Sequence, residues 1–145
     1  MRAWQSAGDT TMMMQVLIVE NDIRLAKILK EIVELDGTHT VTAIASDLPG
    51  VIDASASHPP DIALVDLNLG VSSTGMEVAV QLGKLGIPCL FSTAYPLPFP
   101  VPELAIGCLT KPYNTYSMAQ SLIIAERIIN HQSIPEDIPC GLELY

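Results

Sequence analysis

The sequence predicts an α/β fold, a three-layer sandwich in which helices cover both faces of a doubly wound, five-stranded parallel sheet. Two observations predict it. Short apolar runs of strand length alternate with apolar residues at helical spacing along most of the chain. The strand-like runs are apolar at consecutive positions, which is typical of parallel strands buried on both faces. Because crossovers between parallel strands are right-handed, the connecting helices are expected to form layers on both sides of the sheet.

The first half of the chain contains two strand-and-helix units. Residues 16–19 (VLIV) form a β-branched, apolar run of strand length. Apolar residues then recur at helical spacing over residues 23–36, and a glycine ends this helix. Residues 39–45 (HTVTAIA) predict the second strand. Residues 47–56 begin with an aspartate and a nearby proline and predict a weaker helix, which ends before two prolines.

The second half continues the alternation. Residues 62–66 (IALVD) predict a strand that ends in a carboxylate, and residues 76–85 predict a helix that packs through Val, Ala and Leu. Residues 88–91 (PCLF) and 105–110 (AIGCLT) predict the fourth and fifth strands. Residues 116–129 carry apolar side chains at helical spacing and predict the last helix.

Two segments do not fit this alternation. Residues 95–103 (YPLPFPVPE) carry four prolines, which fix φ and remove amide donors, so a normal fourth helix is expected to be truncated or replaced by a loop. Residues 131–145 contain two prolines and a glycine and predict an appended, flexible tail. The expected limits are 1–14 for a flexible N-terminal arm, 15–130 for the domain and 131–145 for the C-terminal tail.

Composition and charge exclude several classes of protein. Sixteen acidic against seven basic residues give a net charge of −9, which argues against nucleic-acid binding because phosphate contacts need clustered Lys and Arg. The three cysteines have no CxxC spacing and favour a reducing compartment over a disulfide framework. The three histidines lack ligand spacing and are expected at the surface. No apolar run reaches the roughly 18 residues of a membrane-spanning helix. We therefore expect a cytoplasmic protein without membrane contact.

Polar residues follow the predicted strands where those strands end. Doubly wound sheets bind ligands beyond the carboxyl ends of their strands. The residues expected there are Glu20, Asn21, Asp22, Asp66, Thr93 and Lys111. Carboxylates that meet at one edge repel one another unless they hold a cation, and oxygen ligands of this kind suit Mg²⁺. A carboxylate beside Mg²⁺ can attack a phosphoryl group, while a lysine and a hydroxyl neutralise its oxygens.

In this order, the acidic cluster, the strand-ending Asp, Thr93-Ala94 and Lys111-Pro112 resemble the pattern of response-regulator receiver domains over about residues 15–130. The resemblance implies the strand order 2-1-3-4-5 and a cis Lys111–Pro112 bond. It implies that Asp66 is the phospho-acceptor, and that Thr93 and Lys111 bind the phosphoryl group. It also implies a Mg²⁺ site made of Glu20, Asn21, Asp22, Asp66 and the backbone carbonyl of Asn68.

The chain departs from the receiver pattern at Asn21, at Cys108 and in the connection from Thr93 to Lys111, which is shorter than usual and rich in proline. Asn21 stands where the principal metal-binding aspartate is usual, so a lower affinity for Mg²⁺ is expected. Cys108 occupies the place of the aromatic residue that swings inward on phosphorylation in the family. Residues 87–95 (IPCLFSTAY) are partly similar to the PFxFATGY signature of a stand-alone receiver subfamily that lacks this aromatic.

The resemblance implies a bacterial, non-enzymatic, single-domain response regulator. It would accept a phosphoryl group from a histidine kinase or a histidine phosphotransfer protein and signal by protein–protein contact, with a homodimer left open. The alternative is a pseudo-receiver adaptor that works without phosphorylation, which Asn21 and Cys108 favour. A flavodoxin-like redox protein would need a phosphate-cradling loop after the first strand, and ENDIRLA offers none. A phosphohydrolase would need a second Asp two residues after the first, which DLNLG lacks.

Overall fold

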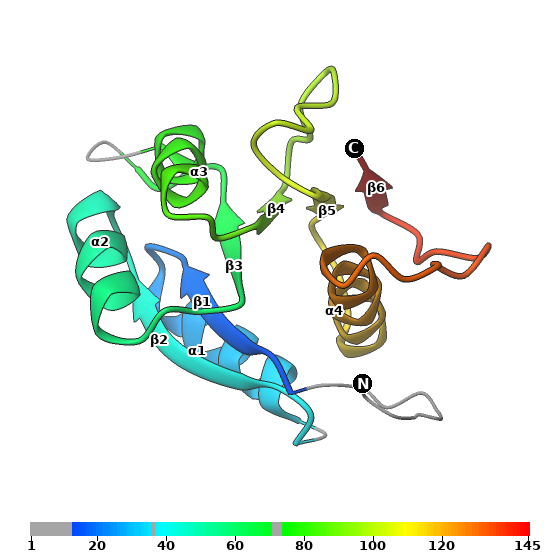
Figure 1. Cartoon of the computed structure of the whole chain (residues 1–145), viewed down its shortest axis with the longest axis horizontal. Coiled ribbons are helices and arrows are strands. Elements are labelled where there is room, and N and C mark those ends of the chain that lie inside the picture. Colours follow the sequence, from blue (N-terminus) through cyan, green and yellow to red (C-terminus); the bar gives the residue numbers. More distant parts are fainter. Residues whose placement is uncertain (1–12, 36, 71–73) are drawn as a thin grey trace.

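The structure of the protein is a computed structural model that describes residues 13–35, 37–70 and 74–145 (Figure 1). The first twelve residues of the expected N-terminal arm lie outside the described residues. The strands are β1 (Gln15–Val19), β2 (Thr40–Ala45), β3 (Ile62–Asp66), β4 (Cys89–Thr93), β5 (Gly107–Thr110) and β6 (Leu142–Leu144). The helices are α1 (Ile23–Glu34), α2 (Leu48–Ser57), α3 (Gly75–Lys84) and α4 (Thr115–Ile129). None of the helices in these ranges is long and apolar enough to cross a bilayer.

The strands form one sheet with helices on both faces, as the sequence predicts. The order is β2-β1-β3-β4-β5-β6, and each pair of neighbouring strands from β2 to β5 in this order is parallel. One hydrophobic cluster lies between the sheet and helices α1 and α4, and a second lies between the sheet and helices α2 and α3. The predicted order 2-1-3-4-5 is confirmed. Since all these strands run the same way, the carboxyl ends of β1, β3, β4 and β5 share one edge.

A sixth strand corrects the expectation of a flexible tail. Residues 142–144 pair antiparallel with β5, so the sheet has six strands rather than five. Without this partner, β5 would leave a row of backbone donors and acceptors unpaired at the edge of the sheet. Leu142 buries its side chain in the cluster beside α4, which adds an apolar contribution to the pairing. The sequence signal is weak because the strand is only three residues long.

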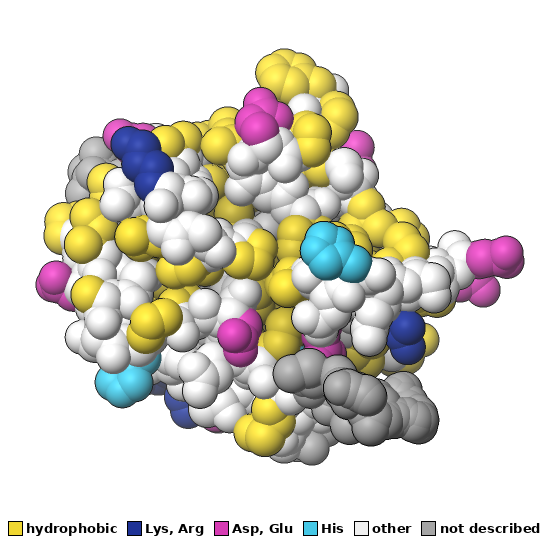
Figure 2. All heavy atoms as spheres, viewed as in Figure 1, with side chains coloured by type: hydrophobic (Ala, Val, Ile, Leu, Met, Phe, Trp, Pro, Cys, Tyr) yellow, Lys and Arg dark blue, Asp and Glu magenta, His cyan; other side chains and the backbone are white. Residues whose placement is uncertain are grey.

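The segment between β4 and β5 contains no helix, which confirms the expected replacement of the fourth helix by a proline-rich loop. Val101 and Ala105 are buried and hold the end of this loop against the sheet. Tyr95 and Phe99 are 85% and 64% exposed. The loop protrudes from the body of the domain, and its apolar side chains form a hydrophobic projection at the top of Figure 2.

Side-chain caps fix where the helices begin. Asp22 accepts hydrogen bonds from the first turn of α1, and Asp47 does the same for α2. Thr74 and Asn114 form capping boxes at the starts of α3 and α4. Helix α3 begins on Gly75 because the chain passes very close to β3 there: a Cβ at Gly75 would lie 2.5 Å from the carbonyl oxygen of Asp66. This contact fixes the start of α3 directly behind the end of β3.

Candidate functional site

Lys111 lies between two buried carboxylates at the carboxyl edge of the sheet. Its Nζ is 3.2 Å from Oδ2 of Asp66 and 3.5 Å from Oε1 of Glu20. Asp66 is the last residue of β3, Glu20 follows β1 and Lys111 follows β5, so three strands bring these groups together. The Lys111–Pro112 bond is cis, as the resemblance implies. The predicted cluster of Glu20, Asp66 and Lys111 is therefore assembled.

Backbone contacts hold Asp66 in place. Its Oδ1 accepts a hydrogen bond from the Asn68 amide at 3.0 Å, while its Oδ2 faces Lys111. Asn68 in turn accepts a hydrogen bond from the Gly70 amide through its side-chain oxygen, at 3.3 Å. The side chain of Asp66 is 9% exposed, so a small part of it is accessible from solvent.

The charges of the cluster shift the pKa values of Glu20 and Lys111. Burial raises the pKa of Glu20, and the neighbouring Asp66 raises it further; the Asp22 amide and Lys111 oppose this without cancelling it. Burial alone would lower the pKa of Lys111, but the charges of Asp66 and Glu20 outweigh burial and raise it. Two acids share one lysine, so the site carries an excess of negative charge and favours a cation.

The remaining predicted metal ligands lie around this cluster. Asp22 caps α1, because its Oδ1 accepts hydrogen bonds from the amides of Arg24 and Leu25. Asn21 is exposed, and its Nδ2 lies 3.2 Å from the point where a Cβ on Gly70 would stand, so its amide reaches the loop after β3. The Oδ1 atom of Asp22 thus caps the helix, while Asn21 lies beside Gly70 in the loop after β3.

The donor set fits a small, hard cation with few protein ligands. Among the residues that the structure describes, no three His, Cys, Asp or Glu side chains gather as a metal site. The cap on α1 uses only Oδ1 of Asp22, so the predicted donors are still the carboxylates of Glu20, Asp22 and Asp66, the Asn21 amide oxygen and the Asn68 backbone carbonyl. Mg²⁺ keeps several waters and commonly takes only one or two carboxylates. These residues therefore fit Mg²⁺.

Thr93 is buried at the end of β4, but its hydroxyl is occupied. Its Oγ1 accepts a hydrogen bond from the Tyr95 amide at 3.1 Å and donates one to the Tyr95 carbonyl at 3.3 Å. The carbonyl of Thr93 accepts from the Lys111 amide at 2.7 Å, which ties β4 to the start of the lysine turn. For Thr93 to contact a group on Asp66, its hydroxyl must leave Tyr95.

No protein-family model matches the chain. The chain is similar to the phyllosphere-induced regulator PhyR of Methylorubrum extorquens, with 29% identity over 125 residues, which cover 82% of this chain and 45% of the relative. The N-terminal domain of a response regulator/sensory box/GGDEF 3-domain protein from Carboxydothermus hydrogenoformans superposes with a TM-score of 0.70 and 27% identity, over 81% of this chain and 97% of that chain. The PhyR stress response regulator superposes with a TM-score of 0.67 and 27% identity, over 92% of this chain and 50% of that chain.

The chain has the receiver-domain fold. It spans half the length or less of the two PhyR proteins described above. The similarity of residues 87–95 to the PFxFATGY subfamily stays a prediction.

An apolar groove, which the sequence analysis did not predict, lies beside the cluster of Glu20, Asp66 and Lys111. The groove, of about 230 Å³, is lined by Glu20 and Lys111 at one end and by Leu25, Ile28 and Tyr113 along its walls. Leu25 and Ile28 belong to the apolar residues at helical spacing that predict this helix, and their exposed fractions are 45% and 53%. The available signal was an apolar stripe wider than one buried face of α1 requires.

Tyr113 also lies beside the cluster, and the sequence analysis did not single it out. It follows the cis proline, and burial raises the pKa of its hydroxyl; the charges of Glu20 and Asp66 also raise it, while Ser92 and Lys111 oppose them. These charges act on Tyr113 because it stands next to the cluster. The only sequence signal is its place two residues after Lys111.

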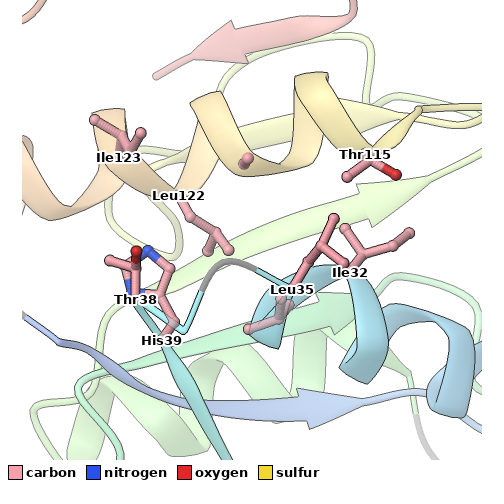
Figure 3. A pocket seen from close by; sticks show the side chains of 9 residues that line it. Ile32, Leu35, Thr38, His39, Thr115, Leu122 and Ile123 are labelled. Atoms are coloured by element: carbon pink, nitrogen blue, oxygen red, sulfur yellow. The ribbon is translucent and has the colours of Figure 1, made fainter.

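A smaller cavity of about 150 Å³ lies between α1 and α4, at the amino end of the sheet and away from Asp66 (Figure 3). Leu122 from α4 faces Thr38 and His39 across it. His39 is buried, which corrects the expectation that all three histidines lie at the surface. Its Nδ1 accepts a hydrogen bond from the Met14 amide at 3.3 Å, so the ring fastens the start of β1 to β2.

Proposed function

We propose that this chain acts as a response-regulator receiver that accepts a phosphoryl group on Asp66 from a histidine kinase or a histidine phosphotransfer protein. The observation that carries the proposal is the position of Lys111, whose ammonium group contacts both Asp66 and Glu20. A lysine held there can pair with a phosphoryl oxygen as soon as Asp66 carries one. The receiver fold supports the same proposal.

The transfer would form one bond and break another. An Oδ atom of Asp66 attacks the phosphorus of the phosphohistidine, the new P–O bond forms and the P–N bond breaks, and the electron pair stays on the imidazole nitrogen. Oxygen atoms of Glu20, Asn21, Asp22 and Asp66 and the Asn68 carbonyl would hold Mg²⁺, which would supply charge neutralisation at the phosphoryl oxygens. Lys111 would exchange its contact with Asp66 Oδ2 for a phosphoryl oxygen, and Thr93 would turn from Tyr95 to donate a second hydrogen bond.

The apolar groove beside the cluster supports a protein as the phosphoryl donor. A protein that presents its phosphohistidine over Asp66 would contact Leu25 and Ile28 of α1 and Tyr113 after β5. Exposed apolar side chains that rim a polar site favour burial by a partner surface. Output by protein–protein contact belongs to the same proposal.

Intact-mass measurement after treatment with acetyl phosphate and Mg²⁺ tests the phospho-acceptor. We expect one phosphoryl adduct on the wild type, none on Asp66→Asn, and an undiminished adduct on Asp53→Asn, which removes an exposed carboxylate from α2. An adduct that persists in Asp66→Asn would refute the assignment.

A pseudo-receiver adaptor that works without phosphorylation is the second candidate. The neutral Asn21 favours it, because one fewer negative charge lowers the expected affinity for Mg²⁺. A wild-type chain that takes no phosphoryl adduct and shows no Mg²⁺ binding at millimolar concentration would support the adaptor.

A further inference from the structure

The tail strand β6 is held on the edge of β5 by a short set of contacts. The Thr110 amide donates to the Gly141 carbonyl and the Tyr145 amide donates to the Ile106 carbonyl, both at 2.9 Å. Between these two bonds only residues 142–144 pair with β5. Such a small contact area belongs to the part of a fold that opens at low free-energy cost.

Gly107 makes this edge unusually easy to approach. It lies opposite Leu144, and a Cβ at Gly107 would overlap the carbonyl oxygen of Glu143. The edge of β5 therefore accepts a backbone at a distance that no other residue type would permit. Because Gly107 has no side chain, the backbone of an added strand can lie directly against β5 at this position.

The tether that carries β6 projects from the domain. Between Asn130 and Cys140 every residue except Pro139 is exposed, and the segment arcs outward before it returns to β5 (Figure 1). It begins with His131 in the left-handed region, at φ 57°, where a non-glycine residue is strained. The strand can thus leave the sheet while α4 and β5 keep their structure.

The same strand β5 connects the tail to the phosphorylation site. The Lys111 amide donates to the Thr93 carbonyl at the end of β4, and the preceding Thr110 amide donates to the Gly141 carbonyl, so neighbouring amides of this strand pair with β4 on one side and with the tail on the other. A shift of Lys111 and Thr93 toward a phosphoryl group on Asp66 would move Thr110 as well. The pairing of Gly141 with Thr110 is the tail contact nearest to Lys111 in the sequence, so it is the contact through which such a shift would reach the tail.

We propose that the edge of β5 is a binding site for an extended strand of a partner protein, and that residues 141–145 occupy it as an autoinhibitory strand until phosphorylation of Asp66 releases them. Release rests on the proposed function, whereas the strand site itself does not. The partner strand runs antiparallel to β5 and resembles the resident segment, with leucine-like residues at alternate positions corresponding to 142 and 144.

A peptide competition experiment tests the strand site. The probe is a fluorescent peptide of residues 137–145 with Cys140→Ser, and a scrambled peptide is the control. The doubly substituted full chain Leu142→Asp/Leu144→Asp, checked by circular dichroism for a native fold, should bind the probe at least tenfold more tightly than the wild type. Adding Gly107→Ala to this chain should lower the affinity at least tenfold. Gly83→Ala should not, because nothing lies within 4 Å of a Cβ at that position. Equal affinity in all these chains would overturn the strand site.

Amide exchange in the unsubstituted chain tests release. With beryllofluoride and Mg²⁺, the amides of Thr110 and Tyr145 should exchange at least fivefold faster, while those of β1 stay unchanged. If beryllofluoride binds and these two amides keep their rates, release is refuted. If beryllofluoride does not bind at Asp66, the proposed function fails and the peptide experiment still decides the strand site. A beryllofluoride-dependent dimer that Leu142→Asp abolishes would make a second copy the occupant and overturn the assignment to a different partner.

Discussion

Replacing Lys111 by methionine removes the cation between Glu20 and Asp66 while keeping a side chain of similar length. At an effective dielectric constant of about 20, charges 3.2 to 3.5 Å apart attract by about 5 kcal/mol per pair. Burial of the charges offsets much of this attraction, and the lysine side chain is 25% exposed, so solvent screens it further. We expect Lys111→Met to lower the free energy of unfolding by about 2–3 kcal/mol at pH 7.

The loss should depend on pH in a defined direction. Without the lysine, the two carboxylates repel each other and their pKa values in the folded state rise above those in the unfolded state. The variant therefore becomes less stable as the pH rises through these values, and a falling pH restores it by protonating one carboxyl.

Urea unfolding at pH 7 and pH 4.5, in metal-free buffer, measures this difference. Lys27→Met replaces an exposed lysine of α1 and should change the unfolding free energy by less than about 0.5 kcal/mol. A Lys111→Met chain as stable as the wild type at pH 7, or a loss of equal size at both pH values, would refute the electrostatic reasoning.

Three further predictions concern the same edge of the sheet. Glu20→Gln should stabilise the metal-free chain at pH 7 and have no effect below the ordinary carboxyl pKa of about 4.5, because the raised pKa of Glu20 makes the wild type lose stability as the pH rises. Urea unfolding across pH 4 to 7 measures this difference in stability, and a difference that does not depend on pH would contradict the prediction. Asn21→Asp should tighten Mg²⁺ binding by about tenfold, measured by calorimetry, and destabilise the metal-free chain through repulsion from Glu20 and Asp66; unchanged affinity would place Asn21 outside the metal site. Gly75→Ala should destabilise the fold by about 1–3 kcal/mol because its Cβ would press on the Asp66 carbonyl. Gly83→Ala in the same helix should stabilise the fold by up to about 1 kcal/mol, because alanine has the higher helix propensity and nothing lies within 4 Å of the added Cβ. Thermal unfolding compares the two variants, and equal effects would mean that α3 can shift away from the Asp66 carbonyl.

The parallel sheet and the central cluster could be predicted because each depends on local patterns. Apolar runs define the strands, and the rule that ligands bind beyond their carboxyl ends places Asp66 and Lys111 together without any knowledge of packing. The replacement of the fourth helix was also predictable, since proline acts through its own backbone.

The other features depend on contacts between distant segments. Strand β6 can pair with β5 because Gly107 leaves room for the Glu143 carbonyl, and no local sequence pattern at either residue predicts this pairing. Leu25 and Ile28 follow the period of a core helix, but the sheet below α1 has room for only part of that stripe. The side-chain direction of Thr93 likewise follows from the loop that comes after it.

The proline-rich loop between β4 and β5 has a consequence for solubility. An exposed apolar segment with side chains such as Tyr95 and Phe99 at its surface is ordinarily prone to pair with another chain and to form an intermolecular β-sheet. Proline at residues 96, 98, 100 and 102 removes every second amide hydrogen, and alternate amides of an extended strand point to the same side, so one edge of this segment has no donors for a hydrogen-bonded ladder. The domain can thus display a hydrophobic surface in crowded solution while the backbone of that surface resists aggregation.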